Sequence, residues 1–199
     1  MNVLKYLLIF FMVSNLSAQS YEKTDVYTSI VTTVIGDLNK DSLADMVMVT
    51  QDTVAESAPY KLQVFFGLLN GDYKLMVETT KAIGVQFPNG RGWLTGNGFS
   101  GVVISKGVLT IENELLRGHF EHKFRFQNGD FELIGFSYGS SDGNGMVSSI
   151  DFNLSTGIRI ETQEPYNDSD EPVTKKTAKI IIRPLPKLQD FIPFENEYY

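Results

Sequence analysis

Four oxygen-bearing side chains at regular spacing form the part of this sequence best suited to chemistry. They are Asp37, Asn39, Asp41 and Asp45, at positions 1, 3, 5 and 9 of one short segment. Calcium takes about six to eight hard oxygen ligands at roughly 2.3–2.6 Å. A tightly curled loop points alternate side chains at one centre, and the carbonyl oxygen of Leu43 would add a further ligand. The spacing therefore predicts a calcium site, with water filling the remaining positions.

The sequence on either side indicates what this loop connects. An EF-hand needs helices on both sides and a bidentate Glu at position 12, where this chain has Met48 within a β-rich run. Ile30–Ile35, before the loop, is also β-rich, so we expect the loop to link two β-strands. One alternative stays open. Asp and Asn are common in turns because their side chains bond to nearby backbone, and such a turn would bind no ion.

Segment 36–45, the apolar strand after it, Val64–Gly67 and Asn70–Asp72 together resemble the FG-GAP (VCBS) repeat, over about residues 30–77. The resemblance implies a propeller-blade-like unit that binds calcium. The ligands it implies are Asp37, Asn39, Asp41 and Asp45, with Leu43 through its backbone. Two features depart from the family. Ser42 stands where the repeat usually has a Gly with positive φ. Only one unit is present, whereas a propeller needs several.

The rest of the chain is patterned for β-structure. Runs of β-branched and aromatic residues alternate with Gly, Asn and Asp turns, and no helix longer than two turns is predicted. Asn-Gly pairs at 70–71 and 128–129 favour type I′ hairpins. We therefore predict a mainly β fold, an antiparallel meander of about ten or eleven short strands in a sheet or sandwich with one propeller-blade-like unit. The predicted strands are Val26–Ile35, Ala44–Thr50, Leu62–Leu68, Tyr73–Glu78, Gly101–Ser105, Val108–Glu112, His119–Gln127, Phe131–Tyr138, Met146–Leu154, Gly157–Thr162 and Thr177–Arg183.

Two of these strands carry more specific expectations. Phe131–Tyr138 is apolar on both faces, which predicts a central place in its sheet. His119 and His122 lie three apart on one strand and so point to opposite faces, which excludes a metal site made by this pair alone. His122 shares its face with phenylalanines, and we expect it to be partly buried and hydrogen-bonded.

The N-terminus has the order of a secretory signal peptide. A start with one positive charge precedes the apolar run Tyr6–Val13, and Leu16–Ala18 provides a small residue before a cut. The run is too short to span a bilayer of about 30 Å, and no second long apolar run follows. We expect a signal at 1–18, one β-rich domain over 19–199 with no integral membrane span, and a secreted or periplasmic location. The chain has no Cys, which excludes disulfides.

The charge balance is acidic. The chain has 17 basic and 24 acidic residues, and loss of Lys5 with the signal leaves 16 against 24, a net charge of −8. A nucleic-acid partner needs a basic face, so this balance argues against one. An acidic surface instead suits solubility and attracts cations.

Two functions remain open after this reading. The metal loop and the lack of a legible catalytic group favour a non-enzymatic, calcium-binding β module with a structural role or a protein or glycan partner. The alternative is a secreted hydrolase with its site near the Gly84–Gly101 loop, where Arg91 and Trp93 would form a contact surface unless Trp93 folds back onto the sheet. Two weaker acidic segments, Asp142–Gly145 and Gln163–Pro172 with its Asp168, Asp170 and Glu171, are interpreted as a turn and a solvated loop.

Overall fold

The computed structural model describes residues 25–91, 98–166 and 173–199. Within this part of the chain all regular structure is β, in eleven antiparallel strands, which confirms the predicted fold class. No helix in these residues could cross a membrane. The predicted signal peptide lies outside the described residues. The strands are β1 (Ser29–Gly36), β2 (Asp45–Gln51), β3 (Tyr60–Gly67), β4 (Tyr73–Thr79), β5 (Gly98–Ser105), β6 (Val108–Leu115), β7 (Gly118–Gln127), β8 (Asp130–Ser141), β9 (Met146–Asn153), β10 (Ile158–Pro165) and β11 (Thr174–Lys179).

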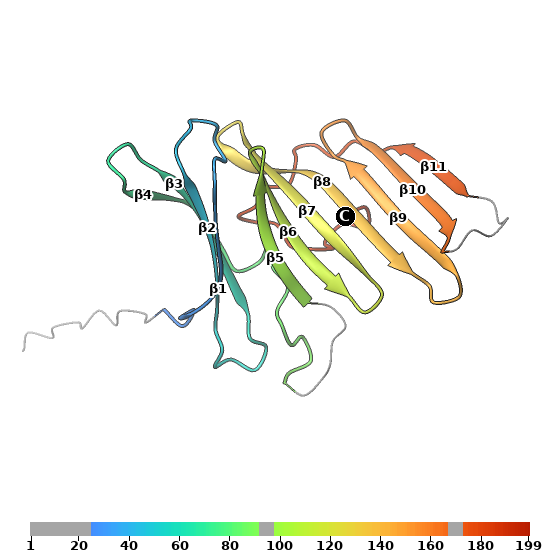
Figure 1. The fold of residues 1–199 in the computed structure, drawn as a ribbon, viewed down its shortest axis with the longest axis horizontal. Helices are drawn as coiled ribbons and strands as arrows, with labels where there is room; N and C mark the ends of the chain where they lie inside the picture. The colour runs from blue at the N-terminus through green and yellow to red at the C-terminus, as the bar shows by residue number, and fades with distance from the viewer. Residues whose placement is uncertain (1–24, 92–97, 167–172) are drawn as a thin grey trace, which may run out of the picture.

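The strands form two meanders, each in sequence order (Figure 1). One sheet has the order β1-β2-β3-β4, and the other runs from β11 to β5 without a crossover. Strands that are neighbours in a sheet are also consecutive in the sequence, and every such pair is antiparallel. β8 occupies the middle of the seven-stranded sheet, as its apolar sequence predicts. The 30–77 segment is thus a four-stranded antiparallel sheet of its own.

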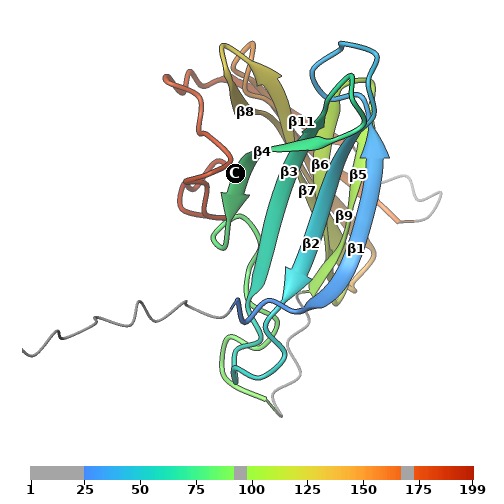
Figure 2. The ribbon, with the colours of Figure 1, turned by 90° about the vertical axis from the view of Figure 1, so that its left-hand side faces the viewer.

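The small sheet stacks on one half of the large sheet (Figure 2). The phenyl ring of Phe66 on β3 meets Phe126 on β7 edge-on, with ring centroids 4.9 Å apart. Tyr60 of β3 likewise contacts Phe99 of β5 at 5.3 Å. Alternate side chains of both sheets enter one continuous hydrophobic core. Its fully buried members include Val47, Val49, Leu62, Val64, Leu109, Ile111, Phe124, Phe131 and Leu133.

The C-terminal segment, residues 180–199, covers more of the same face of the large sheet. Leu188 and Phe191 are buried in the core, and the Phe191 ring lies 5.1 Å from that of Phe124 on β7. Backbone hydrogen bonds fix the segment to β8, including Leu133 N to the carbonyl of Pro186 at 2.8 Å. Strands β9 to β11 extend beyond this cover (Figure 1). The sandwich is therefore closed over β5–β8 and open over the last strands.

Some local expectations hold and others do not. Asn128 and Gly129 both have positive φ (55° and 85°), as a type I′ turn requires. At 70–71 only Gly71 does, and hydrogen bonds from Gly71 N to Leu68 O and from Leu68 N to Asp72 O close a longer loop. The type I′ assignment at 70–71 was wrong because the hydrogen bond from Leu68 N to Asp72 O closes a loop longer than a two-residue hairpin. β10 also continues to Pro165, past the predicted start of the acidic loop at Gln163.

His122 is more deeply buried than its sequence suggested. It shares the core face of β7 with Phe120 and Phe124, as predicted, but only 1 % of its surface is exposed. Neither ring nitrogen has a hydrogen-bond partner, and the ring packs against Phe136 and Phe191 instead. Burial lowers the pKa of His122 to about 3 from an ordinary 6.5, since the charged form is disfavoured away from water. The expected hydrogen bond was wrong because the C-terminal segment seals the ring among aromatic side chains.

Candidate metal centre

The predicted ion-binding loop joins β1 to β2, two antiparallel strands, as its flanking sequence indicates. Two residues with positive φ, Lys40 (64°) and Ser42 (68°), curl the loop back on itself. Such values are uncommon outside Gly, and they give the backbone its tight curvature. Ser42 thus has the conformation for which the FG-GAP pattern usually provides Gly.

Asp37, Asn39 and Asp41 lie in one turn and bond to its backbone. The two carboxylate oxygens of Asp37 accept hydrogen bonds from Lys40 N at 2.6 Å and from Ser42 N at 3.1 Å. Asn39 Oδ1 accepts one from Asp41 N at 3.0 Å. Asp41 Oδ1 accepts one from the amide of Leu43 at 2.8 Å. Each side chain therefore fixes the backbone two to five residues ahead of it, which shapes the loop.

Asp45 has a different environment from the other three. It begins β2 and points to the same side as Val47 and Val49, so its carboxylate is fully buried. Its Oδ2 accepts hydrogen bonds from Leu38 N at 2.7 Å and Asn39 N at 3.3 Å, and its Oδ1 accepts one from Gly67 N at 3.0 Å. A buried carboxylate needs such donors to offset its lost hydration. Asp45 thus links the start of the loop, at Leu38 and Asn39, to the end of β3, at Gly67.

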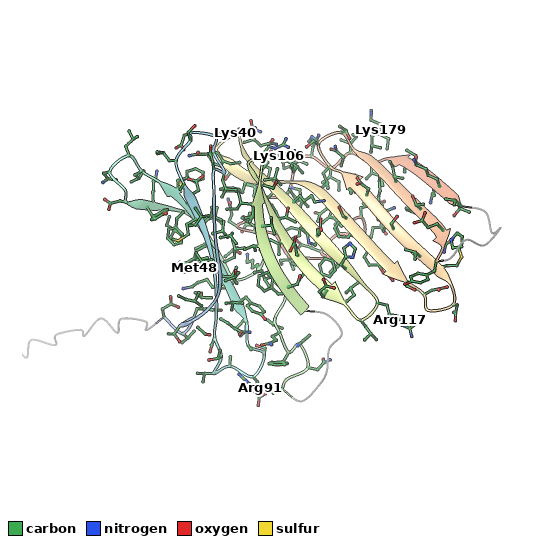
Figure 3. The ribbon with its side chains drawn as sticks, in the orientation of Figure 1. Lys40, Met48, Arg91, Lys106, Arg117 and Lys179 are labelled. Carbon is green, nitrogen blue, oxygen red and sulfur yellow. The ribbon has the colours of Figure 1, made fainter. Side chains whose placement is uncertain are left out.

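The position of Leu38 and Gly67 explains why the loop sits where it does. Leu38 is 1 % exposed and anchors the loop to the core. A Cβ on Gly67 would lie 2.5 Å from the carbonyl oxygen of Ala44, so only Gly allows this close approach. The loop also packs on the β5–β6 turn, where the Lys40 side chain lies against Gly107, and Figure 3 shows Lys40 beside Lys106. The residue types alone did not mark Leu38 as part of the site, whereas Gly67 belongs to the FG-GAP pattern described above.

The side chains of the loop are of the types that bind calcium, but their oxygen atoms already accept hydrogen bonds from backbone amides. In the described part of the chain no three Asp, Glu, His or Cys side chains gather closely enough to hold a metal ion. Asn39 Nδ2 donates to Asp41 Oδ2 at 2.9 Å, so the two side chains that would share an ion are bonded to each other. Hard oxygens of Asp37, Asn39 and Asp41 nevertheless occupy one exposed turn, which is the ligand chemistry calcium prefers.

The other candidate sites have less chemistry. Asp142 Oδ1 accepts hydrogen bonds from the amides of Asn144 and Met146, which lowers the pKa of its carboxyl and makes Asp142–Gly145 a turn between β8 and β9, as predicted. A cavity of about 410 Å³ adjoins the described ends of the Gly84–Gly101 loop. The described residues that line it include no Asp, Glu or His. Trp93, Asp168, Asp170 and Glu171 lie outside the described residues.

The comparisons with known proteins found no relative of this chain. No protein-family model matches the chain, and no curated protein or solved structure matches it. Any assignment of function therefore rests on the residues themselves.

Proposed function

We propose that this chain is an exported, non-enzymatic β module of the FG-GAP (VCBS) type, stabilised by calcium at the loop between β1 and β2. The observation that carries the proposal is the shared turn of Asp37, Asn39 and Asp41, which presents hard oxygens between two antiparallel strands. Leu43 and Asp45 complete the proposed ligand set. The secretory order of residues 1–18 supports a secreted or periplasmic location, where millimolar calcium is available to weak sites.

Calcium would act on stability here and not on a reaction. The ion would neutralise carboxylates in a turn that Ser42 strains, because a non-Gly residue at φ 68° costs conformational energy. To bind, it has to compete with the hydrogen bond between Asn39 Nδ2 and Asp41 Oδ2. We therefore expect weak affinity. A module stabilised in this way serves envelope structure or presents its sheet faces to a protein or glycan.

A thermal melt of residues 19–199, which contain every described strand, tests the proposal. We expect the melting temperature to rise with calcium, by about 5–10 °C at a hundredfold excess over the Kd, and not with magnesium, because only the native state holds the site. The baseline is taken in EGTA. No rise up to about 10 mM calcium, roughly ten times the Kd of the weakest extracellular sites, would remove the metal assignment.

Asp41→Ala and Asp72→Ala form a matched pair for this experiment. Asn70 and Asp72 repeat the bonding of Asn39 and Asp41, with Asn70 Nδ2 to Asp72 Oδ2 at 2.6 Å and Asp72 N to Asn70 Oδ1 at 3.1 Å. Both substitutions remove an exposed carboxylate from a similar turn. Asp41→Ala is expected to abolish the calcium response and Asp72→Ala to retain it. An equal loss in both would show that the response does not arise in this loop.

A further inference from the structure

The core face of the large sheet continues past the C-terminal segment, whose Phe194 and Tyr198 adjoin Tyr138 and Ile150 at its edge. Phe152 on β9 is still buried beneath that segment. In the next row across the sheet, Tyr138, Ile150, Glu161 and Lys176 are consecutive neighbours on β8, β9, β10 and β11. None of these four is buried. The row after it carries serines, Gln163 and Thr174, so the face changes from apolar to polar within two residues of strand.

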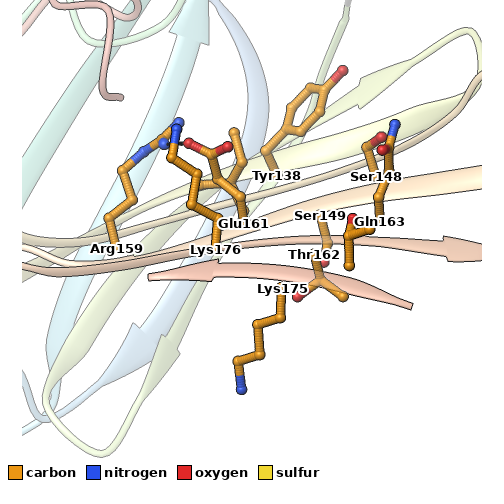
Figure 4. A pocket seen from close by; sticks show the side chains of 11 residues that line it. Tyr138, Ser148, Ser149, Arg159, Glu161, Thr162, Gln163, Lys175 and Lys176 are labelled. Atoms are coloured by element: carbon orange, nitrogen blue, oxygen red, sulfur yellow. Dashed lines mark hydrogen bonds and ion pairs between the residues drawn. The ribbon is translucent and has the colours of Figure 1, made fainter. Parts of the chain in front are cut away.

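An open cavity of about 450 Å³ lies over these rows. Figure 4 shows Arg159, Glu161 and Lys176 pointing to the same side of the strands, with Tyr138 beside them, while Lys175 points away. Arg159 bonds to Glu161 through Nη1, and its side chain is only 11 % exposed. Its Nε has no hydrogen-bond partner. That nitrogen is itself buried, so a ligand in the cavity would have to be met by the terminal nitrogens of the guanidinium, of which Nη1 is bonded to Glu161.

Charge distinguishes this face from the rest of the molecule. Arg159, Lys175 and Lys176 outnumber Glu161 among the side chains that line this cavity, so its lining is net positive in a chain whose net charge is −7. Glu197 of the C-terminal segment lines the adjoining cavity, which it shares with Arg159. An anionic ligand is repelled by the protein as a whole and attracted here, so charge complementarity directs it to this cavity. Arg binds planar carboxylates well because its fork matches their two oxygens.

The neutral lining indicates what carries the carboxylate. One aromatic ring, Tyr138, lies beside Ile150 and is followed by hydroxyl and amide groups from Ser148, Gln163 and Thr174. Sugar rings stack on aromatic faces, and their hydroxyls pair with such groups. We propose that this face of β8–β11 binds an acidic oligosaccharide, with a uronate carboxylate on Arg159 and Lys176.

The inference rests on the interaction role proposed above and supplies its site and ligand class. It is independent of the ion. Calorimetric titration of residues 19–199 in EGTA, with folding verified by circular dichroism, keeps the two apart and prevents calcium from bridging uronates. The probes are an oligogalacturonate, a cello-oligosaccharide of equal length and a short polyglutamate. We expect the oligogalacturonate to bind at least about tenfold more tightly than either other probe.

Two lysines of one strand provide a matched control. Lys176→Gln and Lys175→Gln remove the same charge from β11. Both residues line the cavity, but the side chain of Lys176 points to the side of Arg159 and Glu161, whereas that of Lys175 points away. We expect Lys176→Gln to weaken oligogalacturonate binding about three- to fivefold and Lys175→Gln to leave it unchanged, since an exposed ion pair contributes little beyond contact distance. Equal effects of both substitutions would overturn the site. Absence of oligogalacturonate binding, or equal binding of cello-oligosaccharide or polyglutamate, would overturn the ligand class, whatever the calcium melts show.

Discussion

The carboxylate of Asp45 and the backbone amide of Gly67 are joined by a hydrogen bond of 3.0 Å in the protein interior, although 22 residues separate them. The same carboxylate accepts a hydrogen bond from Leu38 N. One side chain thus ties the β1–β2 loop to the end of β3. Because its partners are all backbone amides, Asp45 stabilises this corner of the fold with or without an ion.

Asp45→Asn tests this structural role directly. The substitution replaces one acceptor oxygen with an NH₂ group, which is a donor. A backbone N–H that now bonds to this oxygen would then be buried without an acceptor. We expect the free energy of unfolding to fall by about 2–4 kcal/mol in EGTA, as urea denaturation would show. Asp37→Asn, whose hydrogen bonds are exposed, is the control and should cost less than about 1 kcal/mol. Equal losses would contradict the assignment.

Gly67→Ala should be destabilising for a steric reason. The new Cβ would lie 2.5 Å from the backbone oxygen of Ala44, so one strand end has to move and the Asp45 hydrogen bond is strained. We expect a loss of about 2–3 kcal/mol in urea denaturation. Gly84→Ala is the control, because nothing lies within 4 Å of its added Cβ. A change below about 0.5 kcal/mol at Gly67 would show that the close approach is not required.

Ser42→Gly should stabilise the loop. Ser42 has φ 68°, a conformation that Gly adopts without steric cost. We expect a gain of about 0.5–1 kcal/mol in EGTA and a severalfold tighter calcium response in the same melts. Ser42→Ala retains the Cβ and should give neither effect. A gain with Ala equal to that with Gly would indicate that the hydroxyl, and not φ, is unfavourable.

Acid should destabilise the protein through His122. Its pKa is about 3 when folded and near 6.5 when unfolded, so the unfolded state binds more protons between these values. The stability that neutral His122 contributes is complete above pH 6.5 and is lost as the pH falls toward 3, by up to about 5 kcal/mol. His122→Phe should remove this part of the pH dependence of the melting temperature. His119→Gln, at an exposed position, should leave it in place. Identical profiles for His122→Phe and the unmodified protein would contradict the prediction.

Phe191→Ala should show that the C-terminal segment belongs to the core. The ring is 3 % exposed and lies 4.8 Å from that of His122. Its loss leaves a cavity, for which we expect a cost of about 3–5 kcal/mol in urea denaturation. Phe194→Ala, at a residue 54 % exposed, removes the same atoms and should cost much less. Similar losses at both positions would mean that the segment as a whole, and not this ring, provides the stability.

The sequence predicted those features that depend on residues close together in the chain. Ten of the eleven strands were placed within three residues at each end because alternation and turn residues act over short spans, as Phe120 and Phe124 on β7 illustrate. The last strand was predicted at Thr177–Arg183 but lies at Thr174–Lys179. The positive φ of Ser42 was expected from the FG-GAP resemblance, which usually has Gly at this position. Contacts between residues far apart in the chain could not be predicted in this way. Nothing near Asp45 indicates Gly67 as its partner, and nothing near His122 indicates that Phe191 will cover it.

The open face of β8–β11 illustrates the same limit. Arg159, Glu161 and Gln163 alternate along β10, and Thr174 and Lys176 do so on β11, a signal that could have been read as one polar face. Which face of the sheet they share depends on register and on where the C-terminal segment stops. Both are set by tertiary packing, so the sequence pattern alone does not distinguish this cavity from an ordinary wet surface.

The position of Leu188 and Phe191 also orders events during synthesis. Strands β5 to β8 are complete long before these residues leave the ribosome, yet one face of His122 and Phe124 stays bare until then. The large sheet therefore cannot reach its final packing until the 180–199 segment has been synthesised.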